Sequence, residues 1–102
     1  MSERKASHLN HAELWEQWKE HGNIEAKKSL IEKHLHIVDY VSSRLAIGLP
    51  RNVSKDDLAS NGVMGLIDAI DKFDYKRGLQ FETYASFRVR GAILDSLRQG
   101  DW

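Results

Sequence analysis

The sequence predicts an all-α fold, a compact bundle of about four helices. Two observations lead to this prediction. Apolar residues recur at intervals of three and four, which is the spacing of a helix face, and they do not alternate as they would in a strand. Proline, which interrupts helices, occurs once in the 102 residues, at Pro50. We therefore expect helices joined by short loops.

The composition is that of one folded domain. A length of 102 residues with 41% apolar residues is too hydrophobic for intrinsic disorder. The 15 basic residues cancel the 15 acidic ones, so no overall positive field attracts nucleic acid. The absence of cysteine excludes disulfides, thiolate nucleophiles and cysteine-bearing zinc sites. No apolar stretch approaches the roughly 18 residues of a membrane span, so we expect a soluble, intracellular protein.

Two helices are expected in the first half of the chain. Asn10 and Glu13 have the spacing of a capping pair, and the helix that follows can end at Gly22. Asn23 can cap a longer helix that stops at residues 48–50. The predicted core stripe of this longer helix contains Ile31, Leu35, Val38 and Leu45, widened by Leu30, Ile37 and Val41. We expect residues 1–22 to form a polar lead with a short amphipathic helix, and residues 23–102 to form the main domain.

Two more helices are expected in the second half. Ser54, with Asp57 three residues later, can open a third helix. Its apolar side contains Leu58, Gly62, Leu66, Ala69, Ile70 and Phe73. Residues 74–78 have the composition of a turn, and a fourth helix is expected from about Thr83 to Gln99, before Gly100. Its apolar residues, four apart, are Ala85, Val89, Ile93 and Leu97.

The third helix has a wider apolar arc than a core stripe needs. Val63 and Ile67 extend this arc towards a polar face that also carries Met64 and Asn61. One interpretation is a broad core stripe, because single exposed apolar residues are common in proteins. The other is a docking face for a partner helix, with an apolar centre and a polar rim.

The fourth helix has a polar stripe opposite its apolar side. The stripe consists of Tyr84, Arg88, Gly91, Asp95 and Arg98. Arginine can make bidentate hydrogen bonds to guanine, and aspartate can accept from the amino group of cytosine. An aromatic ring can stack on a base, and a glycine lets the backbone approach closely. The alternative is that Asp95 and Arg98 form a surface ion pair while Tyr84 packs in the core.

Residues 75–90 interleave aromatic and basic side chains, as in proteins that bind single-stranded nucleic acid. From residue 75 onward, however, five basic residues stand against three acidic ones, an excess of only two. Such a small excess does not support strong electrostatic binding by itself. We therefore expect a second anchor.

The same half of the chain closely resembles conserved region two of bacterial sigma factors. The resemblance is carried by residues 57–74, followed by Arg77-Gly78, Phe81, residues 83–86 and residues 90–93. Residues 48–53 and 90–102 resemble the flagellar or motility group, which is the sigma-D-like group. In all, the resemblance covers about residues 24–102, and residues 9–21 are more loosely similar to the helix that precedes region two.

The resemblance implies two binding surfaces and no cofactor. The first would dock on the clamp-helix coiled coil of the β′ subunit of core RNA polymerase, and a second candidate partner is an anti-sigma factor. The implied polymerase-binding residues are Asp57, Ser60, Asn61, Val63, Met64 and Ile67. The second surface would recognise and melt the minus-ten promoter element, with an unstacked non-template base held at Tyr84. The implied DNA-binding residues are Lys76, Arg77, Phe81, Thr83, Tyr84, Phe87, Arg88, Gly91, Asp95 and Arg98.

Two positions depart from the housekeeping sigma factors. Phe87 and Arg88 stand where those factors have two adjacent tryptophans that wedge against the upstream edge of the bubble, and Leu79 stands where an aromatic residue is common. We expect Phe87 to keep a partial stacking role. Arg88, Asp95 and Arg98 are expected to read the upstream bases of an element whose upstream half contains G·C pairs.

No enzyme or metal site is expected. His34 and His36 point about 200° apart on a helix, and His8 with His11 would give two metal ligands without a third. We expect a bacterial, cytoplasmic protein that is part of a longer factor. Two alternatives stay open: a sigma-like module held by an anti-sigma factor, and a helix-turn-helix repressor that binds intact duplex DNA.

Overall fold

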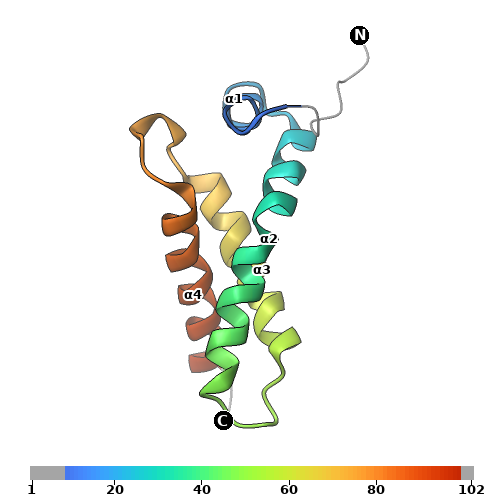
Figure 1. Ribbon diagram of the computed structural model, residues 1–102, viewed down its shortest axis with the longest axis vertical. Coiled ribbons are helices and arrows are strands. Elements are labelled where there is room, and N and C mark those ends of the chain that lie inside the picture. The colour runs from blue at the N-terminus through green and yellow to red at the C-terminus, as the bar shows by residue number, and fades with distance from the viewer. Residues whose placement is uncertain (1–8, 100–102) are drawn as a thin grey trace. The chain divides into compact units, whose positions relative to one another are not determined.

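The computed structural model describes residues 9–99, and this part of the chain forms four α-helices, one short 3₁₀-helix and no strand. The elements are α1 (His11–His21), α2 (Ile24–Ile47), α3 (Lys55–Lys72), η2 (Tyr75–Arg77) and α4 (Phe81–Gln99) (Figure 1). The all-α prediction is confirmed. Within the same residues, no helix combines the length and the apolarity that a membrane crossing needs.

Contacts divide the chain into two compact units, one ending at Lys33 and the other beginning at His34. This division lies within α2, and the boundary between residues 22 and 23 that the sequence suggested stays a prediction. His8 and Gly100, which the sequence analysis named, lie outside the described residues.

The helix caps predicted for the first unit are observed. The Asn10 Oδ1 atom accepts a hydrogen bond from the backbone N–H of Glu13 at 2.8 Å, and Glu13 Oε1 accepts one from the Asn10 N–H at 3.1 Å. Gly22 ends α1 in the left-handed conformation, with φ 64°, which a residue with a side chain rarely adopts. Asn23 Oδ1 accepts from the N–H of Glu25 at 3.0 Å and so caps α2. The buried side chains of this unit are Leu14, Trp15, Ala26 and Leu30.

The core face of α2 in the second unit agrees with the predicted stripe at Ile37 and Val38 but differs from it at Leu35. Leu35 is 41% exposed, whereas the polar residues His34 and Ser42 are buried beside Ile37 and Val38. The centroid of the His34 ring lies 4.7 Å from that of Phe81, in an edge-to-face arrangement. His34 therefore contributes to the core of this unit, whereas Leu35, which apolar spacing alone had placed in the core, is exposed.

Helices α3 and α4 lie side by side and run in opposite directions (Figure 1). Every residue predicted for the apolar side of α3 is buried, and so are Ala85, Val89 and Ile93 of α4, while Leu97 is half-buried. Gly65 permits the close approach of the two helices. A Cβ atom there would lie 2.7 Å from the carbonyl oxygen of Arg88 and 2.8 Å from the Cβ atom of Ala92.

The ends of these two helices are set by local hydrogen bonds and by one aromatic contact. The Ser54 hydroxyl accepts from the N–H of Asp57 at 3.0 Å, which confirms the predicted start of α3. The predicted turn contains η2, and it ends at Gly78 with φ 74°. Helix α4 begins at Phe81, earlier than the predicted Thr83. We attribute the earlier start to a tertiary contact, since the Phe81 ring is buried with its centroid 5.1 Å from that of Phe73.

Candidate functional site

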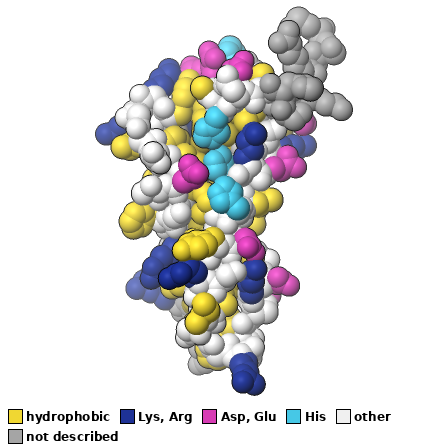
Figure 2. Space-filling model, viewed as in Figure 1, with side chains coloured by type: hydrophobic (Ala, Val, Ile, Leu, Met, Phe, Trp, Pro, Cys, Tyr) yellow, Lys and Arg dark blue, Asp and Glu magenta, His cyan; other side chains and the backbone are white. Residues whose placement is uncertain are grey.

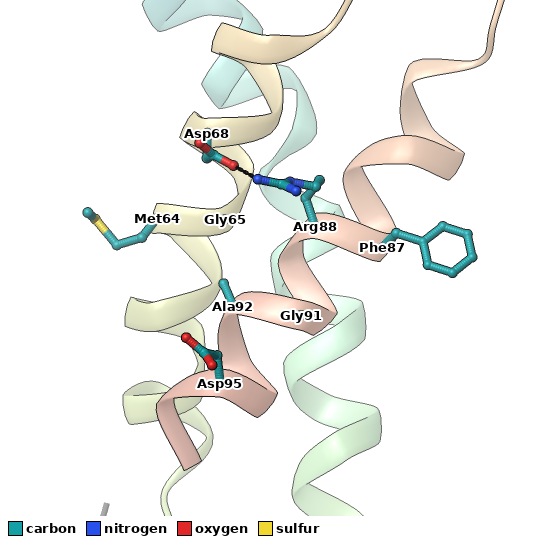
Figure 3. A pocket seen from close by; sticks show the side chains of 8 residues that line it. All are labelled: Met64, Gly65, Asp68, Phe87, Arg88, Gly91, Ala92 and Asp95. Carbon is teal, nitrogen blue, oxygen red and sulfur yellow. Dashed lines mark hydrogen bonds and ion pairs between the residues drawn. The ribbon is translucent and has the colours of Figure 1, made fainter. Parts of the chain in front are cut away.

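The polar stripe of α4 lies along a groove. A cavity of about 400 Å³ is lined by Met64, Gly65, Asp68, Phe87, Arg88, Gly91, Ala92 and Asp95 (Figure 3). A second cavity, of about 570 Å³, is lined by Gly91, Leu94, Asp95, Leu97 and Arg98. The two cavities share Gly91 and Asp95 as lining residues, and we call them together the α3/α4 groove. Four of the five residues of the predicted stripe line one or both of these cavities.

An ion pair joins the two helices across the groove. The Nη2 atom of Arg88 donates a hydrogen bond to Asp68 Oδ2 (Figure 3), and Lys72 Nζ lies 3.0 Å from the other carboxylate oxygen. The hydrogen bond from Arg88, followed by that from Lys72, lowers the pKa of the Asp68 carboxyl below its ordinary value. The bond to Asp68 likewise raises the pKa of Arg88. Both groups are therefore charged at neutral pH.

Asp68 is not among the site residues predicted from the sequence. It lies 20 residues before Arg88, on a different helix, so no periodicity links the two. A lone aspartate on the polar side of α3 is ordinary, and only the packing of α3 on α4 identifies its partner.

The aromatic residues of the predicted DNA surface have unequal exposure. Tyr84 is half-buried, and its ring centroid lies 5.7 Å from that of Phe73, with the ring planes inclined by 31°. Phe87 is 75% exposed and points away from Arg88 (Figure 3). Phe81 is only 4% exposed and lies in the core between Phe73 and His34. Its ring is therefore buried in this structure, and its place among the DNA-binding residues stays a prediction.

The charged residues and the threonine predicted for this surface are accessible. Lys76, Arg77 and Thr83 are exposed near the start of α4. Asp95 and Arg98 are also exposed, and within residues 9–99 no ion pair joins them, so this part of the alternative interpretation is not observed. The face drawn in Figure 2 carries basic and acidic side chains among hydrophobic and other polar ones.

The wide apolar arc of α3 lies on the surface. Met64 is 67% exposed, and Val63 and Ile67 are half-buried. The exposed polar residues around them are Asp57, Ser60 and Asn61. Ser60 and Asn61 donate to backbone carbonyls one turn earlier, at 3.2 and 3.1 Å. We call these six residues the α3 face, and Met64 belongs both to it and to the α3/α4 groove.

The chemistry available at these surfaces is that of recognition. The groove presents guanidinium donors from Arg88 and Arg98, a carboxylate acceptor from Asp95, and open backbone at Gly91, where a Cβ would meet nothing within 4 Å. In the part of the chain that the structure describes, no three histidine or carboxylate side chains gather as they would around a metal ion.

Comparison with known proteins assigns the class. Residues 30–102 match Sigma-70 region 2, and the chain belongs to this family. It is 51% identical over 89 residues to the RNA polymerase sigma-D factor of Bacillus subtilis, an alignment that covers 87% of this chain and 35% of that protein. It is 40% identical over 77 residues to the RNA polymerase sigma factor FliA of Pseudomonas aeruginosa, covering 76% and 31% of the two chains.

A further relative is the RNA polymerase sigma factor FliA of Salmonella typhimurium, 43% identical over 76 residues, with 74% of this chain and 32% of that protein covered. These relatives confirm the resemblance to the sigma-D-like group. The chain spans about a third of the length of the curated relatives it matches.

Proposed function

We propose that this chain is the part of a bacterial sigma factor that binds core RNA polymerase and recognises and opens the minus-ten promoter element, at genes of the motility group. The observation that carries the proposal is the pair of surfaces on adjacent helices of a Sigma-70 region 2 fold. One is the α3 face, with the exposed Met64 among polar residues, and the other is the polar α3/α4 groove. The proposal assigns the chain no enzyme activity and places it in the cytoplasm, with the polymerase.

The α3 face is proposed to dock on the clamp-helix coiled coil of the β′ subunit. An exposed methionine surrounded by polar residues has the character of an interface centre with its rim. Docking would also provide the anchor that a chain of zero net charge lacks. A tethered domain meets promoter DNA at a high effective concentration without further DNA contacts.

Replacing Met64 with aspartate is expected to weaken polymerase binding. A carboxylate buried in an apolar interface loses its hydration, and losing a central contact costs about 2 kcal/mol, or roughly 30-fold in Kd. The measurement is a binding titration of the chain against the isolated β′ clamp coiled coil. Leu79→Asp is the matched control, because Leu79 is 61% exposed but lies outside the α3 face. Equal affinities of the two variants would refute the docking assignment.

The groove and the start of α4 are proposed to bind the minus-ten element. Tyr84, with Lys76, Arg77 and Thr83 nearby in sequence, would hold an unstacked non-template base, and the exposed Phe87 would stack at the upstream edge. Capture of a flipped base offsets the few kcal/mol of unpairing, so opening needs no ATP from this chain. Arg88, Asp95 and Arg98 would read the upstream bases from the groove.

Replacing Asp95 with alanine is expected to relax base preference in the upstream half of the element by about 1–3 kcal/mol, because the acceptor for a cytosine amino group is lost. The measurement is binding by holoenzyme, assembled with a complete sigma factor carrying the variant, to promoters altered one base pair at a time. Glu82→Ala removes the same charge from α4 and is the control. Equal losses on every promoter would contradict base reading by Asp95.

One comparison tests the proposal as a whole. The chain is mixed with core polymerase, and its co-elution and its preference for forked over closed minus-ten DNA are measured. The proposal predicts co-elution, followed by a preference for forked DNA in the holoenzyme. A repressor would instead bind closed duplex without polymerase, and a module held by an anti-sigma factor would show no DNA preference.

A further inference from the structure

We propose that Asp68 is a positioning residue for promoter recognition, which holds Arg88 across the α3/α4 groove so that Arg88 reads a base edge instead of following phosphates. The inference rests on the proposed function, since it concerns how the same groove achieves specificity. It arises from one contact, the hydrogen bond that Arg88 Nη2 donates to Asp68 Oδ2 from the opposite side of the groove (Figure 3).

The geometry fixes the arginine from the α3 side. Lys72 Nζ lies 3.0 Å from the second oxygen of Asp68, so the carboxylate is held at both of its oxygens. Gly65, one turn before Asp68, has no side chain and so lets α4 pack closely against α3 beside the pair. The guanidinium group has five N–H donors, and this bond occupies one of them. The other donors include the two needed for a bidentate contact to guanine.

The pair is accessible from the groove. The side chains of Arg88 and Asp68 are 40% and 36% exposed, so DNA in the groove can reach the guanidinium without breaking its bond to Asp68. Within the same cavity, Asp95 supplies a second carboxylate that faces the groove. One donor and one acceptor at fixed positions can distinguish a G·C pair from an A·T pair.

The charge of Asp68 also limits contacts that carry no sequence information. An unpaired arginine on a flexible side chain binds phosphate oxygens, and such contacts add affinity for any DNA. In the ion pair, the Asp68 carboxylate, which Lys72 also contacts, offsets part of the charge of Arg88, and its hydrogen bond directs the guanidinium towards α3. A pair with a merely structural role would affect unfolding and leave base preference unchanged.

The test uses holoenzyme assembled with a complete sigma factor carrying Asp68→Asn. Binding is measured on a promoter and on a variant whose upstream minus-ten G·C pairs are changed to A·T, over a range of salt concentrations. We expect the ratio of the two affinities to fall about tenfold, corresponding to the loss of one directional base contact. We also expect the slope of log affinity against log salt to steepen by about one, as Arg88 acquires a phosphate contact.

Three further variants separate positioning from charge and from folding. Glu82→Gln makes the same charge change on α4 and should leave the affinity ratio unchanged. Asp68→Glu keeps the carboxylate and should retain most of the ratio. Arg88→Lys should lower the affinity ratio about as much as Asp68→Asn does. The double variant should show no further loss, because the two residues act as one unit. Unfolding midpoints of all the variants establish that each one folds.

The inference is overturned if Asp68→Asn keeps the wild-type ratio, if Glu82→Gln lowers it equally, or if the Asp68 and Arg88 losses add. If the wild-type holoenzyme itself did not distinguish the two promoters, the proposed function would be rejected, and this inference would fail with it.

Discussion

Replacing Gly65 with alanine is expected to lower the free energy of unfolding by about 2 kcal/mol. The added Cβ would lie 2.7 Å from the Arg88 carbonyl oxygen and 3.0 Å from Val89 Cα, and these backbone atoms of α4 can move only if the helix moves. Overpacking of this kind costs up to about 3 kcal/mol, and the better helix propensity of alanine returns about 1 kcal/mol. Urea unfolding of the chain, followed by circular dichroism, measures the difference.

Two other glycines serve as controls for this effect. Gly91→Ala adds the same atom to an exposed side of α4, where nothing lies within 4 Å, so stability should stay the same or rise by up to about 1 kcal/mol. For Gly62→Ala the atoms nearest to the added Cβ belong to side chains, the first being Val38 Cγ1 at 3.0 Å. Side chains can move more easily than backbone, so the free energy of unfolding should fall less than for Gly65→Ala. If Gly65→Ala were as stable as the wild type, the close packing of α3 on α4 would be refuted.

Replacing Tyr84 with alanine is expected to weaken binding of holoenzyme to forked minus-ten DNA by about 1–3 kcal/mol, which is roughly 5- to 150-fold. The physical reason is the loss of the ring on which an unstacked base would stack. Binding to closed duplex should change little, because no base is unstacked there. The measurement is a competition between forked and duplex promoter fragments, with the variant in a complete sigma factor.

Tyr84 also touches the core through Phe73, so a folding control is required. Tyr84→Phe keeps the ring and its packing, and it should retain most of the preference for forked DNA. The unfolding midpoint of the alanine variant separates a loss of stability from a loss of recognition. Equal weakening on forked and duplex DNA would argue against base capture at this position.

Helix boundaries were largely predictable because they depend on neighbouring residues. Asn10, Ser54 and Gly22 set their helix ends through hydrogen bonds or backbone conformations that span a few positions. The start of α4 was the exception. There the boundary depends on Phe81, whose ring is buried against residues distant in sequence.

The proposed surfaces were predictable to a similar extent. The exposed position of Met64 follows from helical periodicity, and so does the common face of Arg88, Gly91 and Asp95. The burial of Phe81 was not foreseen, since a local run of aromatic and basic residues does not show which rings turn inward. The partner of Arg88 was equally hidden, because it lies on another helix.

The sequence by itself determined the helical class, most of the caps, the buried side of α3 and the family, because each is encoded by residue identity at short spacing. Tertiary structure alone decided that His34, Ser42 and Phe81 are buried while Leu35 is exposed. It also decided that Asp68 accepts a hydrogen bond from Arg88. These outcomes depend on which helix faces pack together. Packing between distant segments is governed by shape and charge across the interface, which no single stretch of sequence contains.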